Sequence, residues 1–302
     1  MDYLERSGKV VVGVDGSDGS RAAAAWALDE ARRRGAELEV VYSWQMPALA
    51  YSAPAFVAPT AEEVDQEGHD LLASALSGLD AGDVKVSLVV REGPPAEALQ
   101  LAASEPDVRL LVVGCRGHGG VTELLLGSVT HALSHRHPVP LVIVPRATSV
   151  HPVDPHARIV AGVDGSPESL LALRWAAGAA RLREVPLRAV TAWQHSRHAG
   201  DDPPPGSGSL PTKLQLAAAD VLAAAVEGLG DIGVPVERAI VEGPPARVLV
   251  DEAARAQLLV IGGRGHGRAR EVLFGSVGHA CTHRSPVPLA LVNLPADGAR
   301  GD

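Results

Sequence analysis

Two stretches of the sequence combine glycines with an arginine and a histidine, a set of residues suited to binding phosphate. GCRGHGGVTELLLGS occupies residues 114–128, and GGRGHGRAREVLFGS occupies residues 262–276. Glycine presents no Cβ and adopts backbone angles closed to other residues, so backbone N–H groups can converge on an anion. Arginine adds a planar fork of donors that matches phosphate oxygens. The two stretches therefore predict two phosphate-binding loops.

The end of each stretch predicts a second place for an anion. Gly127-Ser128 and Gly275-Ser276 precede patterns of helical spacing, with Ser128 the expected N-cap. Free N–H groups and the helix dipole favour phosphate at such a point. The alternative is that these glycines only form turns, which are common after strands. The same arginine, histidine and Gly-Ser recur in a copy that has otherwise diverged, and this favours binding.

Two better-known nucleotide motifs are absent from the sequence. It contains no G-x-x-x-x-G-K-[ST], so it has no Walker-type loop. The first apolar run is followed by DGSDGS at residues 15–20 rather than by G-x-G-x-x-G, which disfavours a standard dinucleotide fold. Asp15 in this segment either contacts a ligand or caps the helix that begins near Ser17.

Other residues that could do chemistry carry weaker signals. The last helical pattern of each half has two histidines four residues apart, His131 with His135 and His279 with His283. This spacing can bind a divalent metal, but no third ligand is evident, and we expect no metal site. Cys115 would be either a reactive thiol beside phosphate or a structural residue. Gly263 takes its place in the second copy, which favours the structural role.

The elements that must position the two loops follow from short apolar runs that alternate with helical patterns. In the first half we expect strands at 9–14, 37–44, 83–90, 109–113 and 139–144, and helices at 21–34, 61–79, 95–104 and 128–136. Continuous Val- and Leu-rich runs indicate strands buried on both faces. Strands that alternate with helices predict an α/β fold with a doubly wound, mostly parallel five-stranded sheet and helices on both faces.

The chain is a tandem duplication. GVDGS at 13–17 returns at 162–166, and EGPPA at 92–96 returns at 242–246. We expect one domain over residues 1–146, a linker over 147–157 and a second domain over 158–302. The Pro-, Ala- and Gly-rich segments 46–60 and 195–212 would be irregular loops that either fold over a ligand or move freely.

Composition limits the class of protein. The chain has 302 residues and a formal net charge of −9, and 3% of its residues are aromatic. Nucleic acid is disfavoured as a partner, because backbone binding needs a basic face and base stacking needs aromatic side chains. No apolar run is long enough to span a bilayer, and no secretion signal is evident. With two cysteines and no disulfide framework, the expected location is the cytoplasm.

Taken together, these motifs resemble the universal stress protein (UspA-like) family in its tandem, ATP-binding form. The family's G-two-residues-G-nine-residues-G-[S/T] pattern is matched by Gly114, Gly117, Gly127 and Ser128, and again by Gly262, Gly265, Gly275 and Ser276. Both halves also carry G-V-D-G-S after the first strand and P-V-P before the last. The resemblance covers both halves nearly end to end.

The resemblance implies strand order 3-2-1-4-5 in each half and one ATP site per half, with Mg²⁺ carried by the nucleotide. It also implies that the two last strands pair the halves as a pseudo-dimer, while pairing of two chains as a homodimer stays an open alternative. The implied binding residues of the first half are Gly13, Asp15, Val41, Gly114, Cys115, Arg116, Gly117, His118, Gly119, Gly120, Gly127, Ser128 and Val129. Those of the second half are Gly162, Asp164, Val190, Gly262, Gly263, Arg264, Gly265, His266, Gly267, Arg268, Gly275, Ser276 and Val277.

Three functional readings remain open at this point. The leading hypothesis is a stress-response regulator that signals through ATP occupancy. The second is a slow ATPase or nucleotidyl-handling enzyme on the same fold, with Asp15 or Asp164 as its carboxylate. The third is an interaction module whose nucleotide sites no longer bind, since a fold alone does not fix chemistry.

Overall fold

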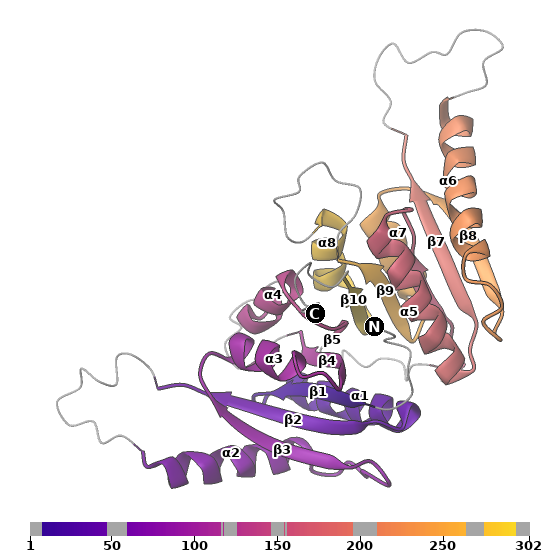
Figure 1. Ribbon diagram of the computed structural model, residues 1–302. Coiled ribbons are helices and arrows are strands. Elements are labelled where there is room, and N and C mark those ends of the chain that lie inside the picture. The colour runs from indigo at the N-terminus through magenta and orange to yellow at the C-terminus, as the bar shows by residue number, and fades with distance from the viewer. Residues whose placement is uncertain are drawn as a thin grey trace, which may run out of the picture. The chain divides into compact units, whose positions relative to one another are not determined.

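The computed structural model divides into two compact units, Met1–Thr148 and Ser149–Asp302 (Figure 1). It describes residues 8–46, 59–115, 117, 126–145, 154, 156–195, 210–263 and 275–293. The division falls inside the predicted linker 147–157, most of which lies outside the described residues.

The first unit alternates strands and helices along the chain. Its elements are β1 (Lys9–Val14), α1 (Asp18–Arg34), β2 (Glu37–Trp44), α2 (Ala61–Ala75), β3 (Val86–Glu92), α3 (Pro95–Ala103), β4 (Val108–Gly114), α4 (Ser128–His135) and β5 (Leu141–Val144). The strands lie in the order β3-β2-β1-β4-β5. All four neighbouring pairs run parallel, and Gly13 stands beside Val41 in the β1–β2 register.

The second unit repeats this plan. Its elements are β6 (Ile159–Gly162), α5 (Pro167–Arg183), β7 (Leu187–Trp193), α6 (Leu210–Glu227), β8 (Val236–Glu242), α7 (Pro245–Ala253), β9 (Leu258–Gly262), α8 (Ser276–Arg284) and β10 (Leu289–Val292). Its strand order, β8-β7-β6-β9-β10, is again 3-2-1-4-5, and its strands are parallel. The predicted fold class is confirmed in both units.

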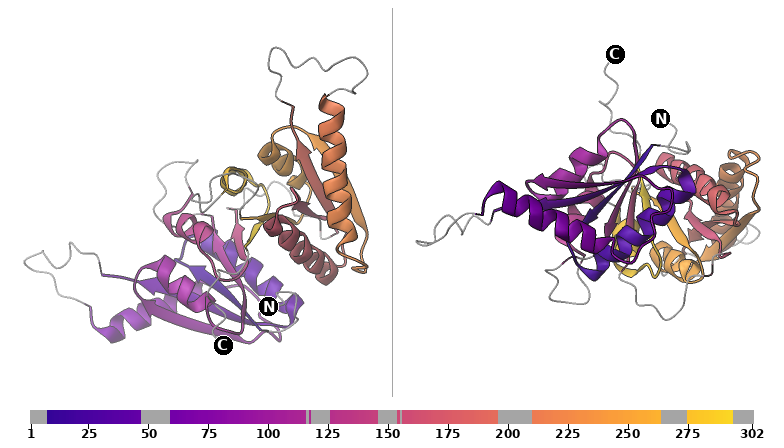
Figure 2. Two further views of the ribbon diagram at one scale, coloured as in Figure 1. Left: turned by 45° about the horizontal axis from the view of Figure 1, so that its top comes forward. Right: turned by 90° about the horizontal axis from the view of Figure 1, so that it is seen from below.

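Helices cover both faces of each sheet (Figures 1 and 2). In the first unit α1 and α2 lie on one face, and α3 and α4 lie on the other. The strands between them are buried: Val10, Val11 and Val12 are 0% exposed. A run buried on both faces needs no polar alternation, which is why the apolar runs predicted these strands.

Local chemistry sets the ends of the elements. Ser17 caps α1 by accepting a hydrogen bond from Ser20 N, and Gly35 ends it at φ 62°, in the left-handed region. Several predicted boundaries were wrong: α1 begins at Asp18 rather than at 21, α2 ends at Ala75 rather than at 79, and β3 spans Val86–Glu92 rather than 83–90. β5 begins at Leu141 rather than at 139, because Pro140 has no N–H to donate, although its carbonyl accepts from Leu111 N at 3.0 Å. In the second unit α6 begins at Leu210, inside the predicted loop 195–212.

The close approach of two backbones at Gly114 carries a testable consequence. An added Cβ there would lie 2.7 Å from Gly19 O and 2.8 Å from Gly19 C, in the first turn of α1. We expect Gly114→Ala to lower the free energy of unfolding by about 1–3 kcal/mol, because backbone atoms cannot rotate away. The matched control is Gly228→Ala, where the nearest atom is at an ordinary 3.4 Å. Equal stability of the two variants in urea denaturation would contradict this packing.

Candidate functional site

Asp15 lies directly after β1 and organises a tight turn. Its Oδ1 accepts hydrogen bonds from Ser17 N at 3.0 Å and from Ser17 Oγ at 2.6 Å. Gly16 between them adopts φ 84°, a conformation that favours glycine. The N-cap of α1 is Ser17, so of the two predicted roles for Asp15 the direct cap is wrong. Asp15 instead holds the capping residue in place.

The second unit builds the same turn with the same distances. Asp164 Oδ1 accepts from Ser166 N at 2.9 Å and from Ser166 Oγ at 2.6 Å, and Gly165 has φ 84°. Ser166 in turn caps α5 by accepting from Ser169 N. The turn is therefore a built feature of both units rather than an accident of one loop.

The end of β4 approaches this turn so closely that side chains are excluded. A Cβ at Gly117 would collide with the Asp15 carboxylate, chiefly with Oδ2. A Cβ at Gly114 would meet the first turn of α1, and one at Gly262 would lie 2.9 Å from Glu168 C in α5. Gly114 and Gly262 are not in the left-handed region, so the predicted need for unusual backbone angles is wrong at these two positions. Space, not conformation, requires glycine there.

Gly13 in β1 and Gly162 in β6, which the sequence analysis placed among the binding residues, also have packing roles. A Cβ at Gly13 would lie 2.6 Å from Leu99 Cδ1, and one at Gly162 would lie 3.0 Å from Leu249 Cδ1. Both leucines belong to the helix on the face opposite α1 or α5. These two predicted binding residues therefore serve helix–sheet packing.

The base of each glycine loop is closed by backbone hydrogen bonds. Gly127 N donates to Cys115 O at 3.0 Å, and Gly275 N donates to Gly263 O at 3.2 Å. In the first unit Thr130 Oγ1 also donates to Gly114 O at 2.7 Å. These bonds bring the start of the last helix to the end of the fourth strand, as the two predicted anion features require.

The N-cap of the last helix differs from the prediction. It is Gly127 in α4 and Gly275 in α8, with no side-chain cap, and Ser128 is the first helical residue. Gly127 has an extended backbone, with φ −60° and ψ 145°. No cap side chain therefore stands over the first N–H groups of either helix. Ser128 and Ser276 are exposed, next to the half-buried Val129 and Val277.

Several predicted residues fall outside the described part of the chain. These are Arg116, His118, Gly119 and Gly120 in the first loop, and Arg264, Gly265, His266, Gly267 and Arg268 in the second. Val41 and Val190 are described, and each residue is 1% exposed, so neither side chain is open to a ligand.

Tyr42 is a residue near the site that the sequence analysis missed. Burial raises the pKa of its phenol, and the negative charges of Glu67 and Asp15 raise it further. Its ring lies close to α2, since a Cβ at Gly68 would be 3.2 Å from Tyr42 Cδ1. In the second unit Thr191 takes this place and donates to Val163 O at 2.9 Å. The only signal in the sequence was its position after Val41.

The remaining sequence candidates show no catalytic arrangement. The rings of His131 and His135 lie 4.5 Å apart, and those of His279 and His283 lie 4.6 Å apart. Within the described residues, no three His, Cys, Asp or Glu side chains gather as a metal site would need. Cys281 is buried, which raises the pKa of its thiol to about 12.

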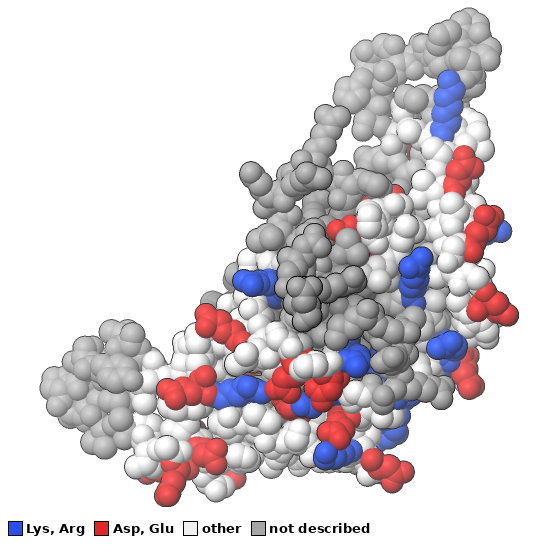
Figure 3. Space-filling model, viewed as in Figure 1, with Lys and Arg blue, Asp and Glu red and all other residues white. Residues whose placement is uncertain are grey.

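On the face shown in Figure 3, acidic and basic side chains are interspersed and form no wide basic patch. Among the described residues, no helix has both the length and the apolar character needed to cross a bilayer.

Comparison with known proteins identifies relatives along nearly the whole chain. The family model described as Universal stress protein family matches residues 7–145 and 156–293. Universal stress protein Rv2005c of Mycobacterium tuberculosis is 33% identical over 287 residues, covering 93% of this chain and 95% of the relative. Universal stress protein Rv2623 of the same organism is 33% identical over 296 residues, covering 94% and 97%.

Solved structures agree on the fold. A universal stress protein from Archaeoglobus fulgidus DSM 4304 matches with a TM-score of 0.68 at 19% identity, covering 97% of this chain and 99% of that one. A putative universal stress protein from Pseudomonas aeruginosa UCBPP-PA14 matches with a TM-score of 0.57 at 14% identity, covering 96% and 94%.

The residues that follow the fourth and fifth strands pack differently in the two units, and this difference can be tested. A Cβ at Gly263 would collide with Asn293, whereas the first unit has Cys115 and Pro145 in these positions. We expect Gly263→Ala to lower the free energy of unfolding by about 1–3 kcal/mol. The loss should be smaller in an Asn293→Ala background, which a double-mutant cycle measures. Additive effects of the two substitutions would show that the residues do not compete for space.

Proposed function

The chain belongs to the universal stress protein family, with two Usp domains in tandem, and from this premise we propose that each unit binds one ATP. The protein would then act as a stress-response regulator whose state depends on nucleotide occupancy. The observation that carries the proposal is the meeting of three features in each unit: the Asp turn, the end of the fourth strand and the uncapped start of the last helix.

The position of these features in the sheet supports a ligand site. β1 lies between β2 and β4. From β1 the chain continues through β2 and β3 on one side, and from β4 to β5 on the other, so the direction of winding reverses between β1 and β4. In open parallel sheets, ligands bind beyond the carboxyl ends of strands at such a switch point. Asp15 follows β1 there, and Cys115 follows β4. The second unit has Asp164 and Gly263 in the same two places.

The phosphates would bind at the start of α4 and α8. Gly127 and Gly275 place no side chain over the first N–H groups, and the helix dipole adds a favourable field for an anion. The glycine loops that precede these helices would supply further backbone donors. Mg²⁺ would be carried by the nucleotide.

Asp15 and Asp164 would take a different part of the nucleotide. A carboxylate repels phosphate, so these side chains suit the hydroxyl groups of ribose or the amino group of adenine. Asp15 Oδ1 already accepts two hydrogen bonds from Ser17, while Oδ2 is the atom that approaches Gly117. Because these hydrogen bonds already occupy Oδ1, Asp15 is better suited to binding a ligand than to accepting a proton from water. We therefore propose regulation by ATP binding rather than ATP hydrolysis.

The proposal predicts separable sites in a calorimetric titration with Mg²⁺-ATP. Asp15→Ala should weaken one site at least tenfold and leave the other unchanged, and Asp164→Ala should do the reverse. The double variant should lose both high-affinity sites, because each carboxylate contacts one nucleotide. Ser17→Ala is the matched control, since it removes the cap but keeps the carboxylate, and it should bind within about threefold of the wild type while losing roughly 0.5–2 kcal/mol of stability.

An unchanged isotherm for the double variant would remove Asp15 and Asp164 from the site. Loss of binding in Ser17→Ala to the same extent as in Asp15→Ala would mean that the turn, and not the carboxylate, supports the nucleotide.

A further inference from the structure

The second unit contains a groove that none of the predicted nucleotide residues lines. Its volume is about 780 Å³, and it runs along α7 beside the end of β8 and the start of β6. Three arginines line it, Arg158, Arg247 and Arg255, above an apolar floor that includes Val241 and Val248. We call this feature the Arg158 groove.

Arg158 is incompletely paired in this groove. Its Nη1 lies 3.5 Å from Glu237 Oε2, and its Nη2 lies 3.8 Å from Glu252 Oε2. Glu252 is already bound by Arg188, through Nε at 2.7 Å and Nη2 at 3.1 Å. The Nε–H group of Arg158 is buried and makes no hydrogen bond. A buried donor without an acceptor is unfavourable, so this group should attract an acceptor from outside the chain.

Arg255 stands next to Arg158 and adds a second positive charge. Gln257 N donates to Arg158 O at 3.0 Å, which holds the segment after α7 against the start of β6. Arg255 is exposed and, within the described part of the chain, forms no ion pair or hydrogen bond. Arg158 and Arg255 both line the groove, where Glu252 is the one carboxylate among the lining residues that pairs with Arg158 in the described part of the chain, and it is shared with Arg188.

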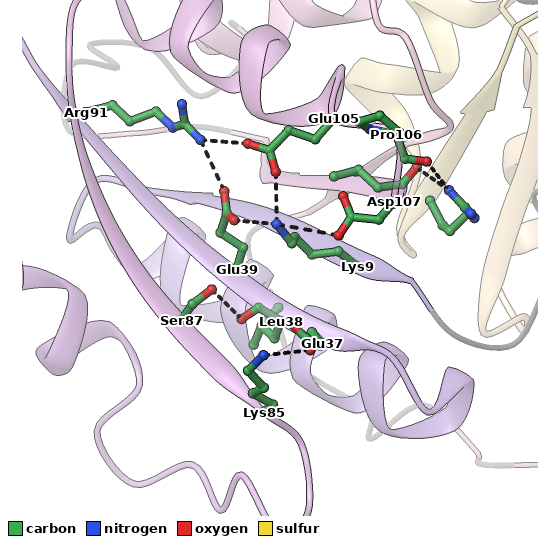
Figure 4. Close-up of polar contacts among 12 residues, drawn as sticks. Lys9, Glu37, Leu38, Glu39, Lys85, Ser87, Arg91, Glu105, Pro106 and Asp107 are labelled. Atoms are coloured by element: carbon green, nitrogen blue, oxygen red, sulfur yellow. Dashed lines mark hydrogen bonds and ion pairs between the residues drawn. The ribbon is translucent and has the colours of Figure 1, made fainter.

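The first unit serves as an internal comparison, because its equivalent position is closed by ion pairs (Figure 4). Lys9, which corresponds to Arg158, lies 3.0 Å from Glu39 and 2.9 Å from Glu105. Arg91 joins the same two carboxylates at 3.5 Å and 3.1 Å. The hydrogen bond that Lys9 Nζ donates to Glu105 is the main cause that raises the pKa of Lys9 above its usual range. Every charge of this cluster has a partner of opposite sign.

Five changes separate the two clusters, and two of them add carboxylates: Glu237 stands where the first unit has Ser87, and Glu252 stands where it has Ala102. Counted from the preceding helix, Arg255 stands where the first unit has Glu105, and Val241 stands where it has Arg91. Arg188 replaces Glu39 on the neighbouring strand. The carboxylate that bonds Lys9 in the first unit is thus an arginine in the second, and the bridging arginine is an aliphatic side chain. The second cluster thus has three arginines and two carboxylates, Glu237 and Glu252, which pair with Arg158 and Arg188.

We propose that the Arg158 groove binds a small ligand through an oxyanion, a carboxylate or a phosphate, held between Arg158 and Arg255. Glu242 and Asp251 also line the groove, so a ligand with a single oxyanion and neighbouring hydrogen-bond donors fits it better than a polyanion. The proposal is independent of the nucleotide sites, since it uses neither the glycine loops nor the Asp turns.

The test follows the arginine Nε–H signals of the full chain by ¹H–¹⁵N NMR, with inorganic phosphate and succinate as separate probes. The Arg158 signal is assigned by its loss in Arg158→Lys. We expect saturable shifts of the Arg158 signal with at least one probe, because the buried Nε–H gains an acceptor. Saturation with phosphate alone assigns a phosphorylated ligand, and saturation with succinate alone assigns a carboxylate.

Two variants decide between a site and general charge attraction. Arg255→Glu places a carboxylate where the first unit has Glu105, so it should pair with Arg158, keep or raise the melting temperature, and weaken probe binding at least tenfold. Arg238→Glu makes the same charge change at an exposed residue of β8 that does not line the groove, and it should bind as the wild type does. Equal weakening in both variants, or shifts that never saturate with either probe, would overturn the proposal.

Discussion

The close approach of the fourth strand to the first turn of the first helix is the constraint on which both units depend. At Gly114 and Gly262 the helix backbone occupies the space that a Cβ would need. This approach brings the Asp turn, the strand end and the start of the last helix to one edge of the sheet. Gly114 and Gly262, which belong to the pattern that resembles a phosphate loop, are thus required by packing. The proposed nucleotide site uses the backbone that this packing brings together.

The duplication separates what the fold needs from what each unit does with it. The Asp–Ser turn is kept with matching distances, 2.6 Å for the Ser17 and Ser166 hydroxyl bonds alike. Other positions differ between the two units. Thr191 takes the place of Tyr42, and the Arg158 groove takes the place of the Lys9 cluster. Gly263 and Asn293, which are neighbours in the second unit, both differ from Cys115 and Pro145 in the first, as expected where neighbours share limited space. The two units are therefore alike in scaffold and different in chemistry.

Most of the fold could be predicted from the sequence, because buried parallel strands appear as uninterrupted apolar runs and the repeat doubles every signal. The positions of Asp15 and Asp164 after the first strand of each unit, and of Gly114 and Gly262 at the end of the fourth strand, also followed from motif spacing. The reasons for the glycines did not, since a clash between Gly114 and Gly19 depends on three-dimensional approach. Likewise Gly127, not Ser128, is the N-cap, and Tyr42 and Arg158 carry no local motif. Placement in the cytoplasm, pairing of the two last strands and homodimer formation stay predictions.

The central claim is that each unit holds one ATP. The most direct measurement is to denature freshly purified protein that has received no added ligand, and to identify and count the released nucleotide by chromatography. The account predicts adenine nucleotide approaching one molecule per unit, or, from protein that emerges empty, uptake to the same ratio in equilibrium dialysis against Mg²⁺-ATP. Protein that carries no nucleotide and takes up none in dialysis would contradict the account and leave the glycines with packing as their only role.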